Sequence, residues 1–158
     1  MLDLGAGAGT QGAWFAARGF DVTAVDISPR VVKLCRAKGL EAHVASFEDL
    51  PFAEGVFDAT LAMSSLLHVP KPHWPAVLAE AARVLRPGGL LCVGSHGGRD
   101  HEGPEAKDPY DPPRFFVTFT DEHLRKALEA RFEIVSFGTI DIGHENGHYQ
   151  VAVARTGC

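Results

Sequence analysis

The sequence predicts an α/β fold with a doubly wound, mostly parallel sheet. An apolar run at residues 1–4 breaks into a glycine-rich turn, and a helical stretch and a β-branched run ending at Asp26 follow it. This order is half of a nucleotide-binding βαβ unit. Strands continue to alternate with helical patterns up to about residue 94, which is typical of parallel sheets. Two β-rich runs after residue 132 then predict a C-terminal antiparallel hairpin.

The glycine turn has a spacing suited to ligand contact through the backbone. Its glycines are Gly5, Gly7 and Gly9, a G-x-G-x-G pattern. Glycine reaches positive φ and carries no Cβ, so the chain turns sharply and a ligand can lie against it. Asp26, at the tip of the neighbouring strand, faces the same crevice. Its two oxygens suit the adjacent hydroxyls of a ribose.

Three elements follow the turn. Residues 11–18 form a helix ended by Gly19, with Trp14 expected in the core. Residues 21–25 form the second strand. A second helix then begins with Ser28 as its N-cap and Pro29 at its first position, and it runs to Gly39. The third strand, at residues 41–45, is short, as an edge strand would be.

The middle of the chain contains a loop and two further strands. Residues 46–55 are too rich in Pro, Gly and acidic residues for regular structure, and residues 57–63 form the fourth strand. Residues 73–86 form a helix with an i, i+3, i+4, i+7, i+11 apolar stripe, and residues 90–94 form the fifth strand. The stripe consists of Trp74, Val77, Leu78, Ala81 and Leu85.

Residues 95–119 are expected to act as a lid over the carboxyl end of the sheet. Residues 95–113 read as loop throughout, and 114–119 as extended chain. Long loops at such a position are uncommon unless they are functional or disordered. Substrate choice should therefore lie here, with His96, His101 and Tyr110 as polar candidates.

The last part of the chain completes a seven-stranded, Rossmann-like sheet. Thr120 caps a helix whose buried stripe is Leu124, Leu128 and Phe132, and the hairpin strands are residues 133–142 and 149–155. Residues 1–158 are predicted to form one domain: a cofactor-binding half (1–94), the lid (95–119), and the helix with the terminal hairpin (120–158).

Composition excludes several classes of function. The net charge of −5 and the pI of about 5.9 disfavour nucleic acid or an anionic membrane as the main partner. No apolar stretch is long enough for a membrane span, and no signal peptide is recognised. Three scattered cysteines indicate reduced thiols in a cytoplasmic protein. His144 and His148 lie in a turn and lack a recognisable ligand spacing, so no metal site is predicted.

Several stretches together resemble class I S-adenosylmethionine-dependent methyltransferases of the small-molecule group called type 11. They are L-D-L-G-A-G-A-G-T at the start, A-V-D-I-S-P around Asp26, S-F-E-D-L-P-F from Ser46, and E-A-A-R-V-L-R-P-G-G before the fifth strand. The resemblance implies S-adenosylmethionine as cofactor. The residues it places at the cofactor are Asp3, Gly5, Ala6, Gly7, Gly9, Asp26, Ile27, Ser46, Phe47, Glu48, Met63 and Ser64.

Two points in this site remain open at the sequence level. The family commonly has an acid at the start of the adenine-side loop, where this chain has Ser46. Phe47 either flanks the adenine or belongs to the core. The family also has one or two helices before the first strand, which this sequence lacks. Either the true start lies upstream or the cofactor site is open on one side.

The implied activity is methyl transfer to an O, N or C atom of a small molecule by in-line displacement. Such a reaction needs alignment more than acid or base groups. His68 and His96, at strand ends, are the candidate bases, and with Tyr110 they are the candidate substrate contacts. His68 could equally be a buried histidine bonded to the backbone. The alternatives are a non-catalytic cofactor-binding protein or scaffold, and a nicotinamide-dependent oxidoreductase, which Thr10 in place of the last fingerprint glycine disfavours.

Overall fold

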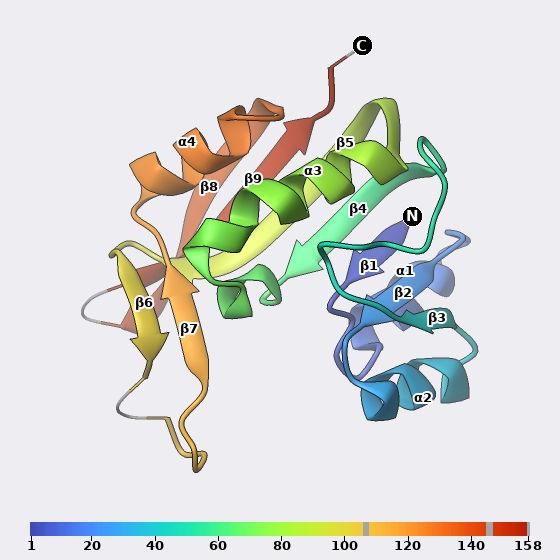
Figure 1. Ribbon diagram of the computed structural model, residues 1–158, viewed down its shortest axis with the longest axis horizontal. Helices are drawn as coiled ribbons and strands as arrows, with labels where there is room; N and C mark the ends of the chain where they lie inside the picture. The colour runs from blue at the N-terminus through green and yellow to red at the C-terminus, as the bar shows by residue number, and fades with distance from the viewer. Residues whose placement is uncertain (106–107, 145–146, 158) are drawn as a thin grey trace.

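The computed structural model describes residues 1–105, 108–144 and 147–157 and contains the predicted seven-stranded sheet (Figure 1). The strand order is β3-β2-β1-β4-β5-β9-β8; the first five strands are parallel, and β9 runs antiparallel to β5 and β8. This order confirms the doubly wound fold and the C-terminal hairpin. The strands are β1 (Leu2–Leu4), β2 (Thr23–Asp26), β3 (Glu41–Val44), β4 (Phe57–Met63), β5 (Leu85–Gly97), β8 (Glu133–His144) and β9 (Gly147–Arg155).

The sheet separates two apolar cores. The helices are α1 (Thr10–Ala16), α2 (Pro29–Ala37), α3 (Trp74–Val84) and α4 (Asp121–Glu129), and Figure 1 shows α3 and α4 lying over the same face of β4, β5, β9 and β8. The larger core joins these two helices to β1, β4 and β5, and the smaller one joins α2 to β2 and β3. Ala24 and Val25, neighbours on β2, belong to different cores, because successive side chains of a strand point to opposite faces.

The local helix signals in the sequence are confirmed. The Ser28 hydroxyl accepts a hydrogen bond from the Val31 N–H at 3.4 Å, and the Thr120 hydroxyl accepts one from the His123 N–H at 3.2 Å. Both satisfy amide groups that the first turn of a helix leaves unpaired. Gly39 follows α2 with a φ of +82°, a left-handed conformation that glycine adopts at low cost.

The expected position of Trp14 is wrong. Its side chain is 52% exposed, and the Arg18 guanidinium lies over its ring at 3.5 Å. The buried residue of α1 is Gly12, where a Cβ would lie 3.0 Å from Leu40 and 3.3 Å from Asp3. Trp14 is two residues further on, about 200° around the helix, and so faces solvent.

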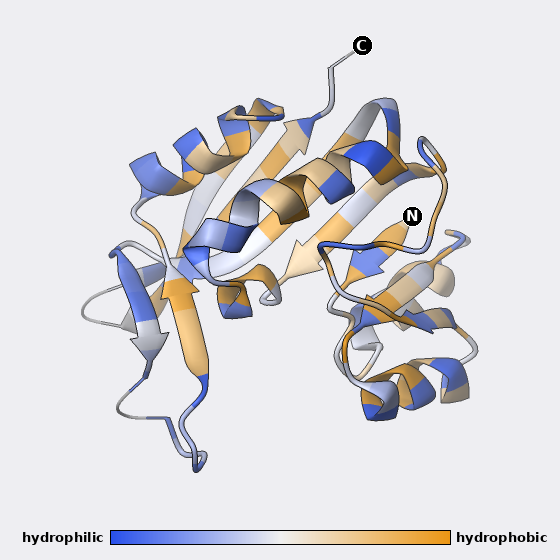
Figure 2. Ribbon diagram, in the orientation of Figure 1, coloured by the Kyte–Doolittle hydropathy of each residue, from blue (hydrophilic) through white to orange (hydrophobic). Residues whose placement is uncertain are grey.

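Two strands differ from the sequence prediction. β5 was expected at residues 90–94 but spans Leu85–Gly97, and its pairing with β4 shifts register between Phe57 and Ala59. The segment 95–113, expected as loop, contains β6 (His101–Pro104), which pairs antiparallel with β7 (Phe115–Thr118). Figure 2 shows β6 as mostly polar and β7 as mostly apolar, and β6 lacks the β-branched residues that signal a strand. The segment that was expected to be a lid therefore contains a hairpin that projects from the sheet (Figure 1).

The loop at residues 46–55 is fastened to α3 by Arg83. The guanidinium donates to the carbonyls of Phe52 at 2.8 Å and Leu50 at 3.0 Å, and to Glu80 at 2.7 Å. Glu80 in turn accepts from the Leu50 N–H at 2.9 Å, and its hydrogen bond with Arg83 lowers the pKa of that carboxyl. The loop is thereby held in place without secondary structure of its own.

Arg83→Gln should lower the stability of the fold. The change removes charged hydrogen bonds to two loop carbonyls and to Glu80, so we expect a loss of about 1–3 kcal/mol and a drop in Tm of roughly 3–10 °C. The matched control is Arg86→Gln, since Arg86 makes an exposed ion pair with Asp58. Thermal unfolding of the three proteins measures the effect. Equal melting temperatures for the two variants would contradict the fastening role of Arg83.

Candidate functional site

The turn after β1 is built on its neighbour β2. The N–H groups of Gly5 and Ala6 both donate to the carbonyl of Val25, at 2.8 and 3.2 Å. Gly5, Gly7 and Gly9 have φ values of +76°, +51° and +72°. Side-chain-bearing residues rarely adopt this region, so the alternating glycines are a requirement of the backbone path.

The three glycines of the turn differ in what surrounds them. A Cβ on Gly5 would overlap Ser65 and lie 3.0 Å from Phe47, and a Cβ on Gly9 would lie 3.1 Å from the Cys35 sulfur. Gly5 and Gly9 are thus required for packing within the protein. A Cβ on Gly7 would meet nothing within 4 Å. Gly7 therefore exposes bare backbone to open space, which is where a ligand can approach.

Asp26 lies directly beside this exposed backbone. Its Oδ2 accepts from the Gly7 N–H at 3.4 Å, and its Oδ1 accepts from the Ser28 N–H at 2.9 Å. Each carboxylate oxygen has two lone pairs, so acceptor capacity remains for a ligand. The carboxylate and the turn are in direct contact, the arrangement that the ribose interpretation of Asp26 needs.

Asp3 is a second carboxylate close to the turn, and one of its oxygens is buried without a hydrogen-bond partner in the described part of the chain. The residue is 1% exposed, and this oxygen is Oδ2. Burial raises the pKa of Asp3 to about 6; the Gly12 N–H opposes the rise, and the charge of Asp26 adds to it. An opposite charge close to such a carboxyl would favour its ionised form.

A cavity of about 220 Å³ lies between Ile27, the residue after Asp26, and the start of the loop at residues 46–55. Phe47 lines this cavity and also packs against the larger core. The Ser46 hydroxyl accepts from the Glu48 N–H at 3.2 Å, and Glu48 pairs with His73 at 2.9 Å. The lining consists of Ile27, Ala45, Ser46, Phe47, Glu48, His68, Val69, Pro70 and Val77.

The end of β4 lies on the other side of the turn. Ser64 has a φ of +53°, and it is the one non-glycine residue at positive φ in the described ranges. Its N–H donates to the Gly94 carbonyl at 2.7 Å, and its hydroxyl shares a 2.9 Å hydrogen bond with the hydroxyl of Tyr149. Sequence reasoning did not select Tyr149. Only the β5–β9 register, which pairs it with His96, could have pointed to it.

The three residues predicted to contact the substrate lie in different parts of the structure. His68 is exposed, lines the cavity, and has its Nδ1 2.8 Å from the carbonyl of Phe115 on β7. His96 is exposed on β5, with its ring edge-on to Tyr149 at a centroid distance of 5.3 Å. Tyr110 lies between β6 and β7, is 61% exposed, and has the Arg114 guanidinium 4.6 Å from its ring centroid.

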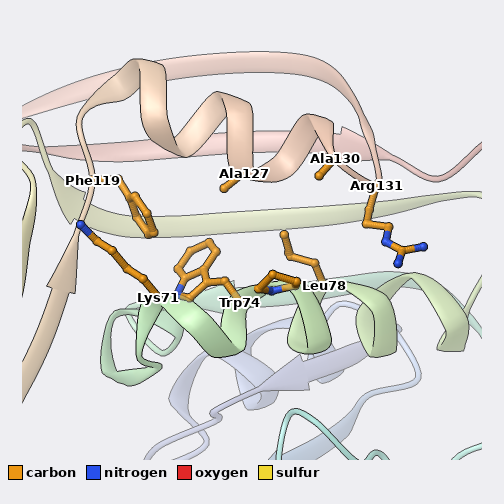
Figure 3. A pocket seen from close by; sticks show the side chains of 8 residues that line it. Lys71, Trp74, Leu78, Phe119, Ala127, Ala130 and Arg131 are labelled. Atoms are coloured by element: carbon orange, nitrogen blue, oxygen red, sulfur yellow. The ribbon is translucent and has the colours of Figure 1, made fainter.

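A second cavity, of about 180 Å³, lies between α3 and α4 (Figure 3). Trp74, Leu78 and Phe119 give it apolar walls, while Lys71 and Arg131 flank it. None of the residues selected from the sequence as cofactor or substrate contacts lines it. The cavity beside the glycine turn is therefore the better candidate for the functional site.

Metal and membrane interpretations gain no support. Within the described ranges, no three His, Cys, Asp or Glu side chains come together in a way that could hold a metal ion. His148 pairs with Asp121 at 2.6 Å, and the side chain of His144 lies outside the described part. No helix in the described part is long and apolar enough to cross a membrane.

Comparison with known proteins identifies the family. Residues 2–93 match the family described as "Methyltransferase domain". The chain belongs to this family. It is also 42% identical over 100 residues to the ubiquinone biosynthesis O-methyltransferase of Xanthomonas oryzae pv. oryzae, with 59% of this chain and 41% of that protein aligned. The chain thus spans less than half the length of the curated methyltransferases that it matches.

Solved methyltransferase structures have the same fold. A SAM-dependent methyltransferase of Methanosarcina mazei matches with a TM-score of 0.87 and 23% identity, covering 99% of this chain and 91% of that one. A second match is the Burkholderia thailandensis 1,6-didemethyltoxoflavin-N1-methyltransferase, solved with 1,6-didemethyltoxoflavin and S-adenosylhomocysteine. Its TM-score is 0.82 and its sequence identity 27%, and the match covers 99% of this chain and 70% of that one. The resemblance to class I methyltransferases of type 11 is confirmed, in preference to a nicotinamide-dependent oxidoreductase.

Asp3 should make this methyltransferase domain less stable as the pH rises. Its pKa is about 6 in the folded protein against an ordinary 3.8, so its contribution to stability is present below pH 3.8 and lost as pH rises through 6. Relative to Asp3→Asn, the unchanged protein should lose about 2 kcal/mol of unfolding free energy between about pH 4.5 and about pH 7.5.

Urea denaturation at both pH values measures this difference. The control is Asp21→Asn, whose carboxylate lies on an exposed residue at the end of the loop before β2. The control should leave the pH dependence unchanged. The same pH dependence in Asp3→Asn and the unchanged protein would contradict the assignment.

Proposed function

We propose that the protein binds S-adenosylmethionine at the glycine turn and transfers its methyl group to a hydroxyl oxygen of a small molecule. The observation that carries the proposal is the bare backbone at Gly7 with the Asp26 carboxylate against it. A ligand that presents a ribose there gains charge-assisted hydrogen bonds from Asp26 without a steric conflict. Residues 1–94 form the cofactor-binding half, and the β6–β7 hairpin acts as the lid.

The surroundings of the turn fit the rest of such a cofactor. Ile27 and Phe47 are apolar walls of the cavity beside Asp26, suited to an adenine ring, with Ser46 and Glu48 at its polar end. At about 220 Å³ this cavity is below the range of roughly 300–1,000 Å³ for whole ligands, so it suits one heterocycle of a larger molecule. Met63 and Ser64 stand at the opposite side of the turn, next to the proposed sulfonium.

The charge of the site supports a cationic cofactor. The negative charge of Asp26 raises the energy of the ionised form of the buried Asp3 carboxyl, in addition to the larger effect of burial. A cation bound nearby would relieve this repulsion. When bound, S-adenosylmethionine supplies an activated methyl group on a positively charged sulfur. The protein then has to align the acceptor with that methyl and exclude water, which can contribute several kcal/mol.

His68 is suited to accept the proton of the hydroxyl acceptor. Phe115 can only accept through its carbonyl, so Nδ1 of His68 is the donor, and the neutral tautomer with this hydrogen has its lone pair on Nε2. A neutral imidazole with a fixed tautomer is a suitable general base near neutral pH. The carbonyl belongs to β7, so the lid also orients the proposed base. His96 and Tyr110 are proposed as further contacts of the substrate.

Oxygen is proposed as the acceptor atom because of the sequence relatives. The 42% identical Xanthomonas protein carries the name of an O-methyltransferase. The toxoflavin enzyme, which is less similar in sequence, carries the name of an N-methyltransferase. Both act on small molecules according to their names, and the net charge of −5 agrees with such a substrate rather than with nucleic acid.

Calorimetry and a turnover assay test this proposal together. Titration with S-adenosylmethionine, S-adenosylhomocysteine and NAD⁺ should give binding of the first two only. Release of S-adenosylhomocysteine should then be measured with catechol, aniline and thiophenol, and catechol should react. Binding without turnover of any of the three would favour a non-catalytic cofactor-binding protein. Binding of NAD⁺ alone would overturn the cofactor assignment.

Asp26→Asn should weaken cofactor binding. The amide keeps the shape of the side chain but loses the charge, which removes about 1.4 kcal/mol or more from the hydrogen bonds to the ribose, or tenfold or more in affinity. The control is Asp21→Asn, five residues earlier and exposed. Calorimetry with S-adenosylhomocysteine measures both variants. An unchanged dissociation constant in Asp26→Asn would refute the ribose role.

A further inference from the structure

Two hydroxyl groups meet across a strand at the carboxyl end of the sheet. Ser64 follows β4, Tyr149 lies on β9, and β5 runs between these two strands. Their hydroxyls are 2.9 Å apart and share a hydrogen bond. Such a contact needs a long side chain that reaches over the middle strand, so it is a specific feature of this sheet.

Gly94 on β5 makes this reach possible. A Cβ at this position would lie 2.7 Å from the Tyr149 hydroxyl and would overlap the end of Met63. The missing side chain leaves a gap that the tyrosine hydroxyl crosses. The Ser64 N–H, 2.7 Å from the Gly94 carbonyl, continues the β4–β5 pairing and holds Ser64 at the edge of this gap.

The backbone of Ser64 is strained, and strain of this kind is common at ligand sites. Ser64 combines a φ of +53° with an exposed side chain. A non-glycine residue stays in this conformation only when its surroundings hold it there. The hydrogen bonds to Gly94 and Tyr149 do so, and they direct the serine hydroxyl toward the tyrosine.

The orientation of Tyr149 is fixed by the hydrogen bonds of the residues before and after it on β9. Its neighbours His148 and Gln150 point to the opposite face, where both donate to Asp121 at 2.6 and 2.7 Å. Successive side chains alternate along a strand, so Tyr149 points to the face that carries Gly94 and His96. The His96 ring stands edge-on to it at 5.3 Å.

This hydroxyl pair is next to the glycine turn. Ser65, the residue after Ser64, is in contact with Gly5, the first glycine of the turn. Ligands of doubly wound sheets bind at the carboxyl ends of the strands, beside the switch in strand order, which here lies between β1 and β4. The pair therefore lies on the acceptor side of the proposed cofactor, away from the cavity that suits the adenine.

We propose that Ser64 and Tyr149 together bind the methyl acceptor, and that the acceptor presents a hydroxyl group on an aromatic ring. The proposal rests on the function proposed above. Of the two O–H groups in the pair, one is used between the two residues, so one donor and several lone pairs remain for an acceptor hydroxyl. The Met63 thioether and the His96 ring on the same face suit contact with an aromatic ring. Tyr149 is thus a specificity-determining residue.

Calorimetry on the full chain saturated with S-adenosylhomocysteine tests the proposal, with catechol as the probe. The variants are Tyr149→Phe and Ser64→Ala, and the matched control is Ser136→Ala, an exposed serine on β8. Loss of one hydrogen bond should raise the catechol dissociation constant about tenfold in each of the first two variants. The double variant should lose little more, because the two hydroxyls act as a unit.

The affinity for S-adenosylhomocysteine distinguishes the possible outcomes. It should stay within about twofold in Tyr149→Phe and Ser136→Ala, and Ser136→Ala should bind catechol like the unchanged protein. Unchanged catechol binding in Tyr149→Phe, or no catechol binding by the unchanged protein, overturns the inference while the cofactor site stands. A loss of S-adenosylhomocysteine affinity in Tyr149→Phe also overturns it, since the pair would then support the cofactor. Failure of the unchanged protein to bind S-adenosylhomocysteine overturns the proposed function and this inference together.

Discussion

The parallel pairing of β1 with its two neighbours is the constraint on which the site depends. β1 is only three residues long, yet it pairs with β2 on one side and β4 on the other. The carbonyl of Val25 on β2 then receives two N–H groups of the glycine turn, while Ser65 after β4 packs against Gly5. The turn is thus fixed between Asp26 and the end of β4. A shift in either pairing would separate the carboxylate from the exposed backbone at Gly7.

The electrostatics of the site supports the proposed binding of a cationic cofactor. Asp3 precedes the turn by two residues and is fully buried, so it cannot lower its energy by contact with water. Burial of the ionised carboxylate therefore lowers the stability of the folded protein, and it raises the pKa of Asp3 to about 6. Perturbed pKa values cluster at functional sites, so the raised pKa of Asp3 supports the proposed site at the glycine turn. The buried carboxyl of Asp3 and the exposed backbone of Gly7 thus lie in the same short segment of the chain.

Sequence reasoning succeeded where local chemistry decides structure. The caps at Ser28 and Thr120 and the bounds of β4 depend on a few neighbouring residues, and all were predicted correctly. It failed where long-range packing decides: Trp14 is exposed because Gly12 occupies the inward position of α1. β6 was missed because its strand structure depends on pairing with β7. Tyr149 was missed because its contact with Ser64 depends on strand order, register and a glycine on the intervening strand.

The most direct test of the central claim compares alanine at Gly7 and at Gly19. Both glycines have positive φ, +51° and +87°, and at both a Cβ would meet nothing within 4 Å. Alanine should therefore cost each variant a similar stability, about 1–2 kcal/mol. If the exposed backbone at Gly7 is the cofactor contact, calorimetry should show at least a tenfold loss of S-adenosylhomocysteine affinity in Gly7→Ala and none in Gly19→Ala. Equal affinity in the two variants would contradict the account.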